Sequence, residues 1–459
     1  MKAFLLLILL LAFSSAEAAT YYVRTDGHDT NCNGTADAAE AAAPNCAWLT
    51  IGKAETSVSG TNTIIVGNGS YTENLTIDAS GTDASNLLTF RAQNNRLAII
   101  TGTVVISGNY VKFDGFKVLK PDSVEKTISM TGTYITTTNC YFDLKPSWTP
   151  YAQTDVHVAM SGSHNTATNN YITHGCQGAG VGGSYNTFSN NEIDHPTLIY
   201  NGNCGDIDFV RVFGDHHVFS GNYFHGLVPE ENGAAHTDAF QSFDNAGQTI
   251  SDTLFENNIM TLVENSCWIL SMTYNKSAAN TGIVIRNNVC YSSTNYCADL
   301  KYVSFEFYNN TCVILHAGYG IEVAADGDHT GKVKNNIFIA LDDESVSPVP
   351  YSCKNATQGT DCKNNILWAP NFITRYDGET YVGDTVNTDP LLTNIAGGVF
   401  TLQSGSPART GGVDLSATGF STDVRGVARP QGATWSRGAY EYYEQGSIHG
   451  VTSMGVSKK

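Results

Sequence analysis

A short phrase that recurs along the chain constrains the fold more than any other feature. In each copy a strand-like run ends in an Asn-Asn or Gly-Asn pair, and a β-branched or aromatic residue follows within two positions. Repeats of at least about 20 residues suit the coils of a solenoid, in which each coil packs on its neighbours and longer repeats carry loops. The second Asn of the pair recurs at intervals of 21 to 36 residues, at Asn170, Asn191, Asn222, Asn258, Asn288, Asn310, Asn336 and Asn365.

Asparagine suits the corner of such a coil for two reasons. It tolerates the left-handed backbone conformation, and its amide can hydrogen-bond to the same amide in the coils above and below. Low charge content (15%), 44 Gly and 23 Tyr also favour strands joined by tight turns. Asn pairs in the surface turns of a β-sandwich would not recur with an alternating strand before each one. We therefore expect an all-β parallel β-helix with a ladder of stacked Asn side chains.

The two ends of the stack have their own signals. Upstream of Tyr134 the coils continue as strand-like runs without the Asn pair. The segment from Ile51 to Ala54 predicts a short helix that covers the open end of the stack and its unpaired strand edge. The Gly-rich segment from Asp377 onward predicts an irregular C-terminal cap. The β-helix domain with its caps thus spans 20–443, and we expect 444–459 to be a disordered tail.

The first 19 residues have the layout of a secretory signal peptide. Lys2 precedes an apolar run, and small residues follow up to Ala19, so we expect cleavage near Ala18 or Ala19. No later segment is apolar for the roughly 20 residues that a membrane helix needs. We expect a monomer secreted to the extracellular space or the periplasm. The net charge of −18 argues against nucleic acid as a partner.

Eleven cysteines in an exported chain predict disulfides, with at least one cysteine left over. Proximity in sequence suggests Cys32 with Cys46 and Cys353 with Cys362. Two further cysteines, Cys290 and Cys312, each follow a stacked Asn by two residues. They either pack in the core as small apolar residues or pair across coils. No C-x-x-C spacing indicates a zinc site.

Both ends of the chain resemble a known group of proteins. The N-terminal phrases Tyr21-Tyr22-Val23, Asp26-Gly27 and Gly69-Ser70-Tyr71-Thr72-Glu73 are similar to the N-terminal cap of bacterial pectate-lyase-like β-helix proteins. The phrases Gly405-Ser406-Pro407-Ala408 and Gly438-Ala439-Tyr440-Glu441 are similar to their closing segment. This resemblance implies a single-stranded right-handed parallel β-helix. It implies no single activity, because the superfamily contains lyases, hydrolases and epimerases.

Two neighbouring coils carry the densest cluster of ionisable residues, in the runs DIDFVRVF from 206 and HTDAFQSF from 236. Aligning the phenylalanines that end both runs places Asp208 over Asp238 and Arg211 over Gln241. Strict alternation along a strand would put Asp208 and Arg211 on opposite faces. Adjacent parallel strands lie roughly 4.8 Å apart, so the two carboxylates must share a proton, a cation or an Arg.

This cluster is the predicted site, and it lies beside the longest insertion between Asn repeats. The residues from Arg211 to Asn222, His225 and the run from 236 also resemble a recurring signature of bacterial β-helix proteins thought to act on polysaccharides. We predict catalytic roles for Arg211, His236, Lys301 and Gln241, Ca²⁺ binding by Asp208, Asp238 and Glu264, and substrate binding by Asp206, His225, Glu230 and Glu231.

Three functions remain open from the sequence. A polysaccharide lyase would act on a uronate-containing glycan by β-elimination, with Lys301, His236 or Arg211 as the base and Arg211 or Ca²⁺ neutralising the uronate carboxylate. The charge of −18 weighs against a polyanionic substrate. A glycoside hydrolase would use two carboxylates about 5 Å apart. A non-catalytic protein would bind glycans through its loops, and the Asp residues would then only cap turns and pair with Arg211.

Overall fold

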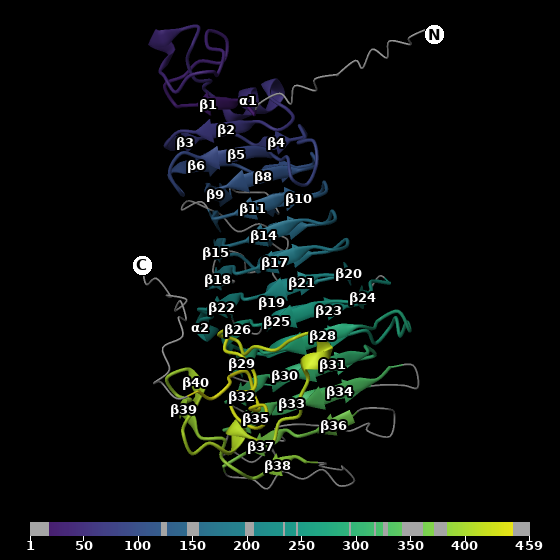
Figure 1. Ribbon diagram of the computed structural model, residues 1–459. Helices are drawn as coiled ribbons and strands as arrows, with labels where there is room; N and C mark the ends of the chain where they lie inside the picture. Colours follow the sequence, from purple (N-terminus) through teal and green to yellow (C-terminus); the bar gives the residue numbers. More distant parts are fainter. Residues whose placement is uncertain are drawn as a thin grey trace, which may run out of the picture.

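The computed structural model describes residues 18–120, 126–144, 156–197, 206–232, 235–244, 247–292, 295–315, 318–324, 329–341, 361–370 and 383–443. Within them the chain winds into a parallel β-helix (Figure 1). From β2 to β33 each coil contributes one strand to sheet A, one to sheet B and one to sheet C, in that order, whereas the described parts of the end coils contribute to one or two of these sheets. The predicted signal peptide (1–19) lies almost wholly outside the described residues, as does the whole predicted tail.

In the described residues, sheets A and B each have 13 strands, and sheet C has 10. All neighbouring strands in these three sheets are parallel, as the solenoid prediction requires. Sheet A consists of β1 (Thr20–Val23), β2 (Thr63–Val66), β5 (Leu88–Ala92), β8 (Val111–Asp114), β11 (Thr136–Thr138), β14 (Thr166–Thr168), β17 (Thr187–Ser189), β21 (Val218–Ser220), β25 (Leu254–Glu256), β28 (Ile283–Arg286), β31 (Phe305–Tyr308), β34 (Gly331–Lys334) and β36 (Asp361–Lys363).

The other two sheets follow the same order along the stack. Sheet B consists of β3 (Gly69–Tyr71), β6 (Ala98–Thr101), β9 (Lys117–Lys120), β12 (Tyr141–Leu144), β15 (Tyr171–Thr173), β18 (Glu192–Asp194), β22 (Tyr223–His225), β26 (Ile259–Val263), β29 (Val289–Ser292), β32 (Thr311–Ile314), β35 (Ile337–Ala340), β37 (Ile366–Trp368) and β38 (Thr385–Val386). Sheet C consists of β4 (Leu75–Ile77), β7 (Val104–Ile106), β10 (Lys126–Met130), β13 (Val156–Met160), β16 (Gln177–Val181), β19 (Asp206–Val212), β23 (His236–Phe243), β27 (Ser266–Ser271), β30 (Asn295–Lys301) and β33 (Gly318–Ala324).

Several smaller elements lie outside the three sheets. The strands β20 (Gly214–Asp215) and β24 (Ile250–Ser251) pair at one corner, and β39 (Leu392–Asn394) and β40 (Val399–Leu402) form an antiparallel hairpin. A second helix, α2 (Pro229–Asn232), stands in the insertion before β23. Three short 3-10 turns complete the described elements: Glu40–Ala42, Pro407–Arg409 and Ser416–Thr418. No helix in the described part of the chain is long and apolar enough to cross a membrane.

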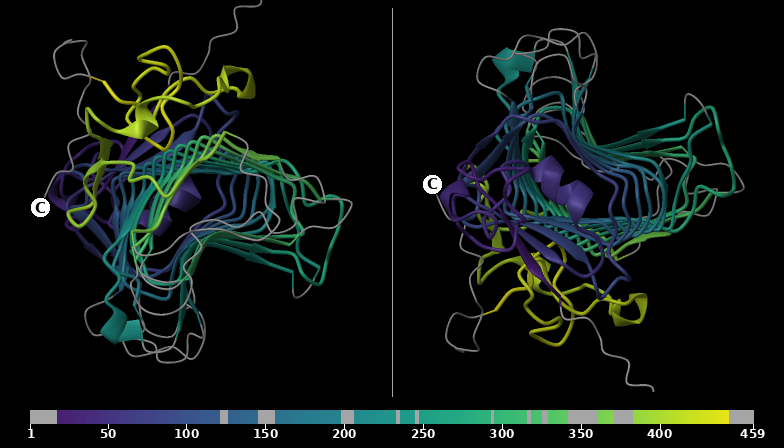
Figure 2. Two further views of the ribbon diagram at one scale, coloured as in Figure 1. Left: turned by 90° about the horizontal axis from the view of Figure 1, so that it is seen from below. Right: turned by 90° about the horizontal axis from the view of Figure 1, so that it is seen from above.

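The predicted N-terminal helix is present as α1 (Ile51–Ser57) and lies across the open end of the coils (Figure 2). Thr50 caps it, since its hydroxyl accepts a hydrogen bond from the backbone N–H of Lys53 at 3.1 Å. Two of its own residues, Ile51 and Ala54, are fully buried. The helix therefore covers the first coil as expected.

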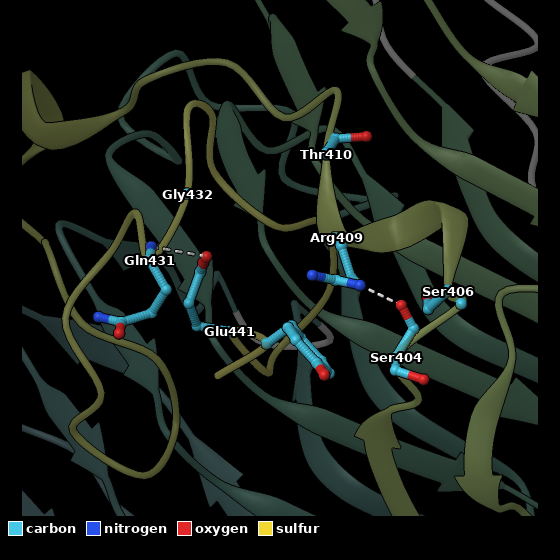
Figure 3. Close-up of a pocket in the computed structure, with 9 residues that line it drawn as sticks. Ser404, Ser406, Arg409, Thr410, Gln431, Gly432 and Glu441 are labelled. Atoms are coloured by element: carbon cyan, nitrogen blue, oxygen red, sulfur yellow. Dashed lines mark hydrogen bonds between the residues drawn. The ribbon is translucent and has the colours of Figure 1, made fainter. Parts of the chain in front are cut away.

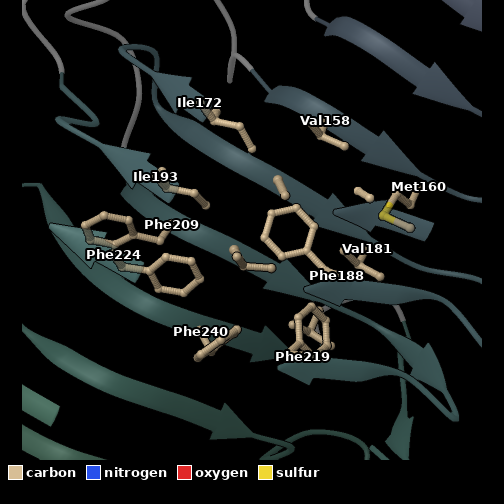
Figure 4. Close-up of a cluster of buried hydrophobic side chains, with 14 of the residues drawn as sticks. Val158, Met160, Ile172, Val181, Phe188, Ile193, Phe209, Phe219, Phe224 and Phe240 are labelled. Carbon is tan, nitrogen blue, oxygen red and sulfur yellow. The ribbon is translucent and has the colours of Figure 1, made fainter. Parts of the chain in front are cut away.

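Side chains that alternate inward from all three sheets fill the interior. Phe209 stacks on Phe224 with centroids 5.2 Å apart, and Phe219 stacks on Phe255 at 5.1 Å. These rings are fully buried, and Figure 4 shows how they meet aliphatic side chains of neighbouring coils. Such stacking of like residues in successive coils makes the interior one continuous apolar core.

The predicted Asn ladder is present, but the left-handed conformation and the hydrogen bonds along the stack belong to different residues of each pair. The first residue takes the left-handed conformation, with φ of 57° at Asn257 and 55° at Asn287. The second residue is buried and hydrogen-bonds along the stack: Asn258 donates its backbone N–H and its amide to Asn288 Oδ1, at 2.9 and 3.0 Å. Described links run from Cys140 through eight Asn residues to Asp384.

The irregular C-terminal segment, 387–443, packs on the flank of the stack (Figure 2). Trp435 and Leu415 cluster with Tyr308 of sheet A. The left-handed Asn residues of the lower coils bind this segment, and Asn309 donates to the carbonyl oxygen of Ser436 at 2.9 Å. A buried ion pair, Arg429 with Glu441 at 3.1 Å, lies at its centre.

Disulfides join several of the described cysteines. The predicted pair Cys32 and Cys46 is confirmed. Cys290 and Cys312 are neighbours in sheet B, but each pairs across the coil interior with a cysteine of sheet C: Cys290 with Cys267, and Cys312 with Cys297. Cys353 lies outside the described residues, so its predicted pairing with Cys362 stays a prediction.

Candidate functional site

The predicted register between the two ionisable runs is confirmed. In β19 and β23, Asp208 pairs with Asp238 and Arg211 pairs with Gln241. The predicted faces are wrong, however, because the pairing of the two strands skips Phe209 and its counterpart. The same gap recurs between β27 and β30, so sheet C bends along one line. After the bend, Asp208 and Arg211 lie on the same outer side and contact each other.

Arg211 is held by acceptors on three sides. Its Nε donates to Asp208 Oδ2 at 2.6 Å, and its Nη2 donates to Asp206 Oδ2 at 3.1 Å. The amide oxygen of Gln177, turned toward the guanidinium, accepts at 2.7 to 3.2 Å. The guanidinium carbon lies 5.6 Å from the centre of the Phe243 ring. Burial raises the pKa of Asp208 to about 8, and the charges of Asp238 and Asp206 act in the same direction, whereas Arg211 lowers it.

His236 is held by a second buried carboxylate. Its Nδ1 lies 2.8 Å from Asp238 Oδ2, and because a carboxylate accepts, Nδ1 carries the proton and Nε2 has the free lone pair. This hydrogen bond raises the pKa of His236 above its ordinary value. The other oxygen, Asp238 Oδ1, accepts from the Asn265 amide at 2.9 Å and from the backbone N–H of Ser266 at 3.1 Å. Gln241 donates weakly to Oδ2 at 3.4 Å.

Exposure separates the roles of these groups. The carboxylates of Asp208 and Asp238 are 0% exposed, whereas the side chains of Arg211 and His236 are 18% and 47% exposed. The register places His236 directly beside Asp206, which is itself bonded to Arg211. The outer face of sheet C thus presents a guanidinium and an imidazole together, each fixed from below by a buried carboxylate.

The predicted Ca²⁺ ligands do not form a cation site. Asp208 bonds to Arg211, Asp238 bonds to His236 and Asn265, and Glu264 lies in the turn before β27. Among the described residues no group of three or more His, Cys, Asp or Glu side chains is arranged to hold a metal ion. The donor set therefore does not fit Ca²⁺ in this arrangement, and Ca²⁺ binding stays a prediction without geometric support.

Lys301 lies on the same face but away from Arg211. It stands three strands further along sheet C, which at roughly 4.8 Å per strand is about 14 Å. Its Nζ pairs with Asp299 Oδ2 at 2.9 Å and with Glu322 Oε2 at 3.6 Å. Burial opposes the charge of Lys301, but the two carboxylates outweigh it and raise its pKa. A lysine held protonated is a poor base for the chemistry at Arg211.

Three predicted substrate-binding residues lie elsewhere. His225 bonds to Glu192 at 2.9 Å and lies 3.2 Å from Asp194, on the outer side of sheet B. Glu231, in α2, accepts from His195 at 2.7 Å, and Glu230 of the same helix is exposed. The insertion folds back toward sheet B, so the structure does not bring these residues to Arg211. No residue pattern in the insertion indicates the direction in which it folds.

A separate cavity of about 290 Å³ lies in the C-terminal segment, between 404–410 and 431–442 (Figure 3). Arg409 donates to the carbonyl oxygen of Ser404 on one side of it. On the other side the buried carboxylate of Glu441 accepts from the backbone N–H of Gln431 at 3.1 Å. None of the predicted site residues lines this cavity.

Comparisons with known proteins support the fold. The structure resembles that of pectate lyase Pel9A, with a TM-score of 0.57 and 15% identity over 93% of this chain and 97% of that one. It also resembles XylC, solved in complex with xylose, with a TM-score of 0.55 and 11% identity over 82% and 87% of the two chains. No protein-family model matches the sequence, and no curated protein matches it. The chain thus has the right-handed parallel β-helix fold that these two structures share.

Proposed function

We propose that this protein is a secreted polysaccharide lyase that cleaves a uronate-containing glycan by β-elimination at the outer face of sheet C. The observation that carries the proposal is the pair of groups on that face: buried carboxylates fix Arg211 and His236 side by side. The fold shared with pectate lyase Pel9A is one on which such chemistry is found. The argument for the site rests on this chain's own residues.

Each residue has a defined task in this proposal. Arg211 binds the uronate carboxylate and stabilises the negative charge that develops when the adjacent α-proton leaves. His236 removes that proton through Nε2, since Nδ1 is bonded to Asp238. The electron pair of the broken C–H bond forms the new double bond and expels the glycosidic oxygen. The imidazolium can then return the proton to that oxygen, which balances the reaction.

A glycoside hydrolase fits less well. Its two carboxylates must contact the sugar as acid and as base or nucleophile. The side chains of Asp208 and Asp238 are 0% exposed, and both are bonded to neighbouring side chains. They therefore serve Arg211 and His236 in this proposal. The prediction that glycan is the partner is common to the lyase, the hydrolase and the non-catalytic binder.

The test is a panel of uronate polymers, including pectate and alginate, assayed for the ultraviolet absorbance of unsaturated products with and without chelator. We expect one polymer to give absorbance that His236→Gln and Arg211→Lys both abolish. His216→Gln is the matched control, because His216 also bonds an aspartate through Nδ1 (Asp215, 2.6 Å) but lies at another corner of the coil. Silence across the panel would refute the lyase, reducing sugar without absorbance would indicate a hydrolase, and binding without cleavage would indicate a binder.

A further inference from the structure

A bulge in sheet B stands next to the proposed site. The pairing of β26 with β29 shifts between Thr261 and Val263, so Leu262 is the extra residue. Leu262 has a φ of 56° and is 48% exposed. A bulky residue in the left-handed region is strained, and bulges beside active sites change the direction of the chain that follows. Here that chain is the turn of Glu264 and Asn265, which leads into β27.

Asn265 contacts both members of the Asp238–His236 pair. Its amide nitrogen lies 2.9 Å from Asp238 Oδ1, and 3.1 and 3.0 Å from Nδ1 and Nε2 of the His236 ring. Because these two ring nitrogens flank a single carbon, a group almost equally far from both lies over the face of the ring. The lone pair of Nε2 points along the ring plane, so Asn265 leaves it open. The backbone N–H of Asn265 donates to the carbonyl oxygen of Thr237 at 3.1 Å and anchors the turn on β23.

We propose that Asn265, placed by the Leu262 bulge, is a positioning residue that fixes the Asp238–His236 pair so that Nε2 of His236 points at the substrate. This inference rests on the proposed function for its catalytic meaning. Asp238 receives hydrogen bonds on both oxygens, from His236 and Gln241 on one and from Asn265 and Ser266 on the other. A carboxylate held at both oxygens cannot rotate, and the ring bonded to it is then held in one orientation.

The surroundings of His236 leave this task to Asn265. The ring is nearly half exposed, so packing alone does not hold it. The charged groups that act on it are Asp206 and Asp208 from β19 and Asp238 from its own strand, with Arg211 bonded to the first two. Among the described residues, Asp238 is the hydrogen-bond partner of the ring, and the Asn265 amide lies against the face of the ring.

The experiment compares Asn265→Ala and Asn265→Asp with the native protein. Asn265→Asp keeps the volume and removes both amide donors. On the polymer that the native protein cleaves, we expect kcat to fall roughly 10- to 100-fold with KM within about twofold, because a small misplacement of a base affects the chemical step and not ground-state binding. Asn275→Ala is the control, since its amide likewise donates across a turn, to the carbonyl oxygens of Gly247 and Gln248, but away from His236.

A second readout needs no activity. Nitrogen NMR of the His236 ring reports which ring nitrogen carries the proton. We expect one fixed tautomer, Nδ1–H, in the native protein and in Asn275→Ala, and averaged tautomers in both Asn265 variants. Unchanged kcat together with a fixed tautomer in the Asn265 variants would overturn the inference. A native protein inactive on every polymer would sink the proposed function, while the tautomer measurement would still decide the role of Asn265.

Discussion

Removing one rung of the Asn ladder should cost far more than removing an amide at the surface. Asn258→Ala deletes four hydrogen bonds: the amide donates to the carbonyl oxygen of Phe219 and to Asn288 Oδ1, both at 3.0 Å, and Oδ1 accepts from the backbone N–H and the amide of Asn222 at 3.0 and 2.8 Å. At about 1 kcal/mol net for each bond, the loss is about 4 kcal/mol. The buried N–H of Asn222 would also lose its partner, which adds to the cost.

The assay is urea unfolding followed by circular dichroism, combined with hydrogen exchange at the backbone N–H of Asn222. A solenoid can unfold coil by coil, so the exchange rate reports the local effect that a global midpoint dilutes. Asn94→Ala is the matched control, because Asn94 is exposed and donates a single bond to Asn68 at 3.1 Å, and its loss should stay within about 0.5 kcal/mol. Equal unfolding midpoints and equal exchange rates for the two variants would refute the view that the ladder stabilises the stack.

Two further predictions concern the site and the bulge. The base in the proposal is neutral His236, and its hydrogen bond to Asp238 raises its pKa, so kcat/KM should rise with pH to a midpoint above the pKa of an ordinary histidine. Asp238→Asn removes this effect and should lower the midpoint. An unchanged midpoint in Asp238→Asn would contradict the assignment of His236 as the base. Leu262→Gly should unfold at a temperature equal to or above that of the native protein, because glycine adopts a positive φ without strain. The control is Leu97→Gly, at a leucine that is 53% exposed but has no positive φ, and it should lower the free energy of unfolding by about 1 kcal/mol. The reverse order of the two unfolding temperatures would argue against strain at Leu262.

The register of the site could be predicted from the sequence, but its faces could not. The shared final phenylalanine was enough to align Asp208 with Asp238, because equivalent strand residues of neighbouring coils stack on one another even where the loops between them differ in length. The bend that brings Arg211 onto the same side as Asp208 depends on two successive core residues, Phe209 and Val210, both turned inward. A strand pattern with period two contains no such step.

The partners of the site residues were also beyond the sequence. Asn265 stands 27 residues after Asp238 and reaches it only because a bulge at Leu262 re-aims the turn, and a single Leu gives no sign of a positive φ. The two properties expected of asparagine were right in kind but fell on different residues of each pair. The left-handed residue, such as Asn257, forms the corner, while Asn258 is buried and bonded along the stack.

The returning C-terminal segment changes how the stack must come apart. In a plain solenoid each coil contacts only its neighbours, and unfolding can start at either end. Here Arg429 donates to Asn287, 142 residues earlier, and Asn309 is bonded to a carbonyl 127 residues later. These contacts link coils that are not adjacent, so the lower coils are coupled as one cooperative block. None of the described hydrogen bonds joins this segment to the upper coils, from β2 to β21, so these coils retain more freedom to fray from their end.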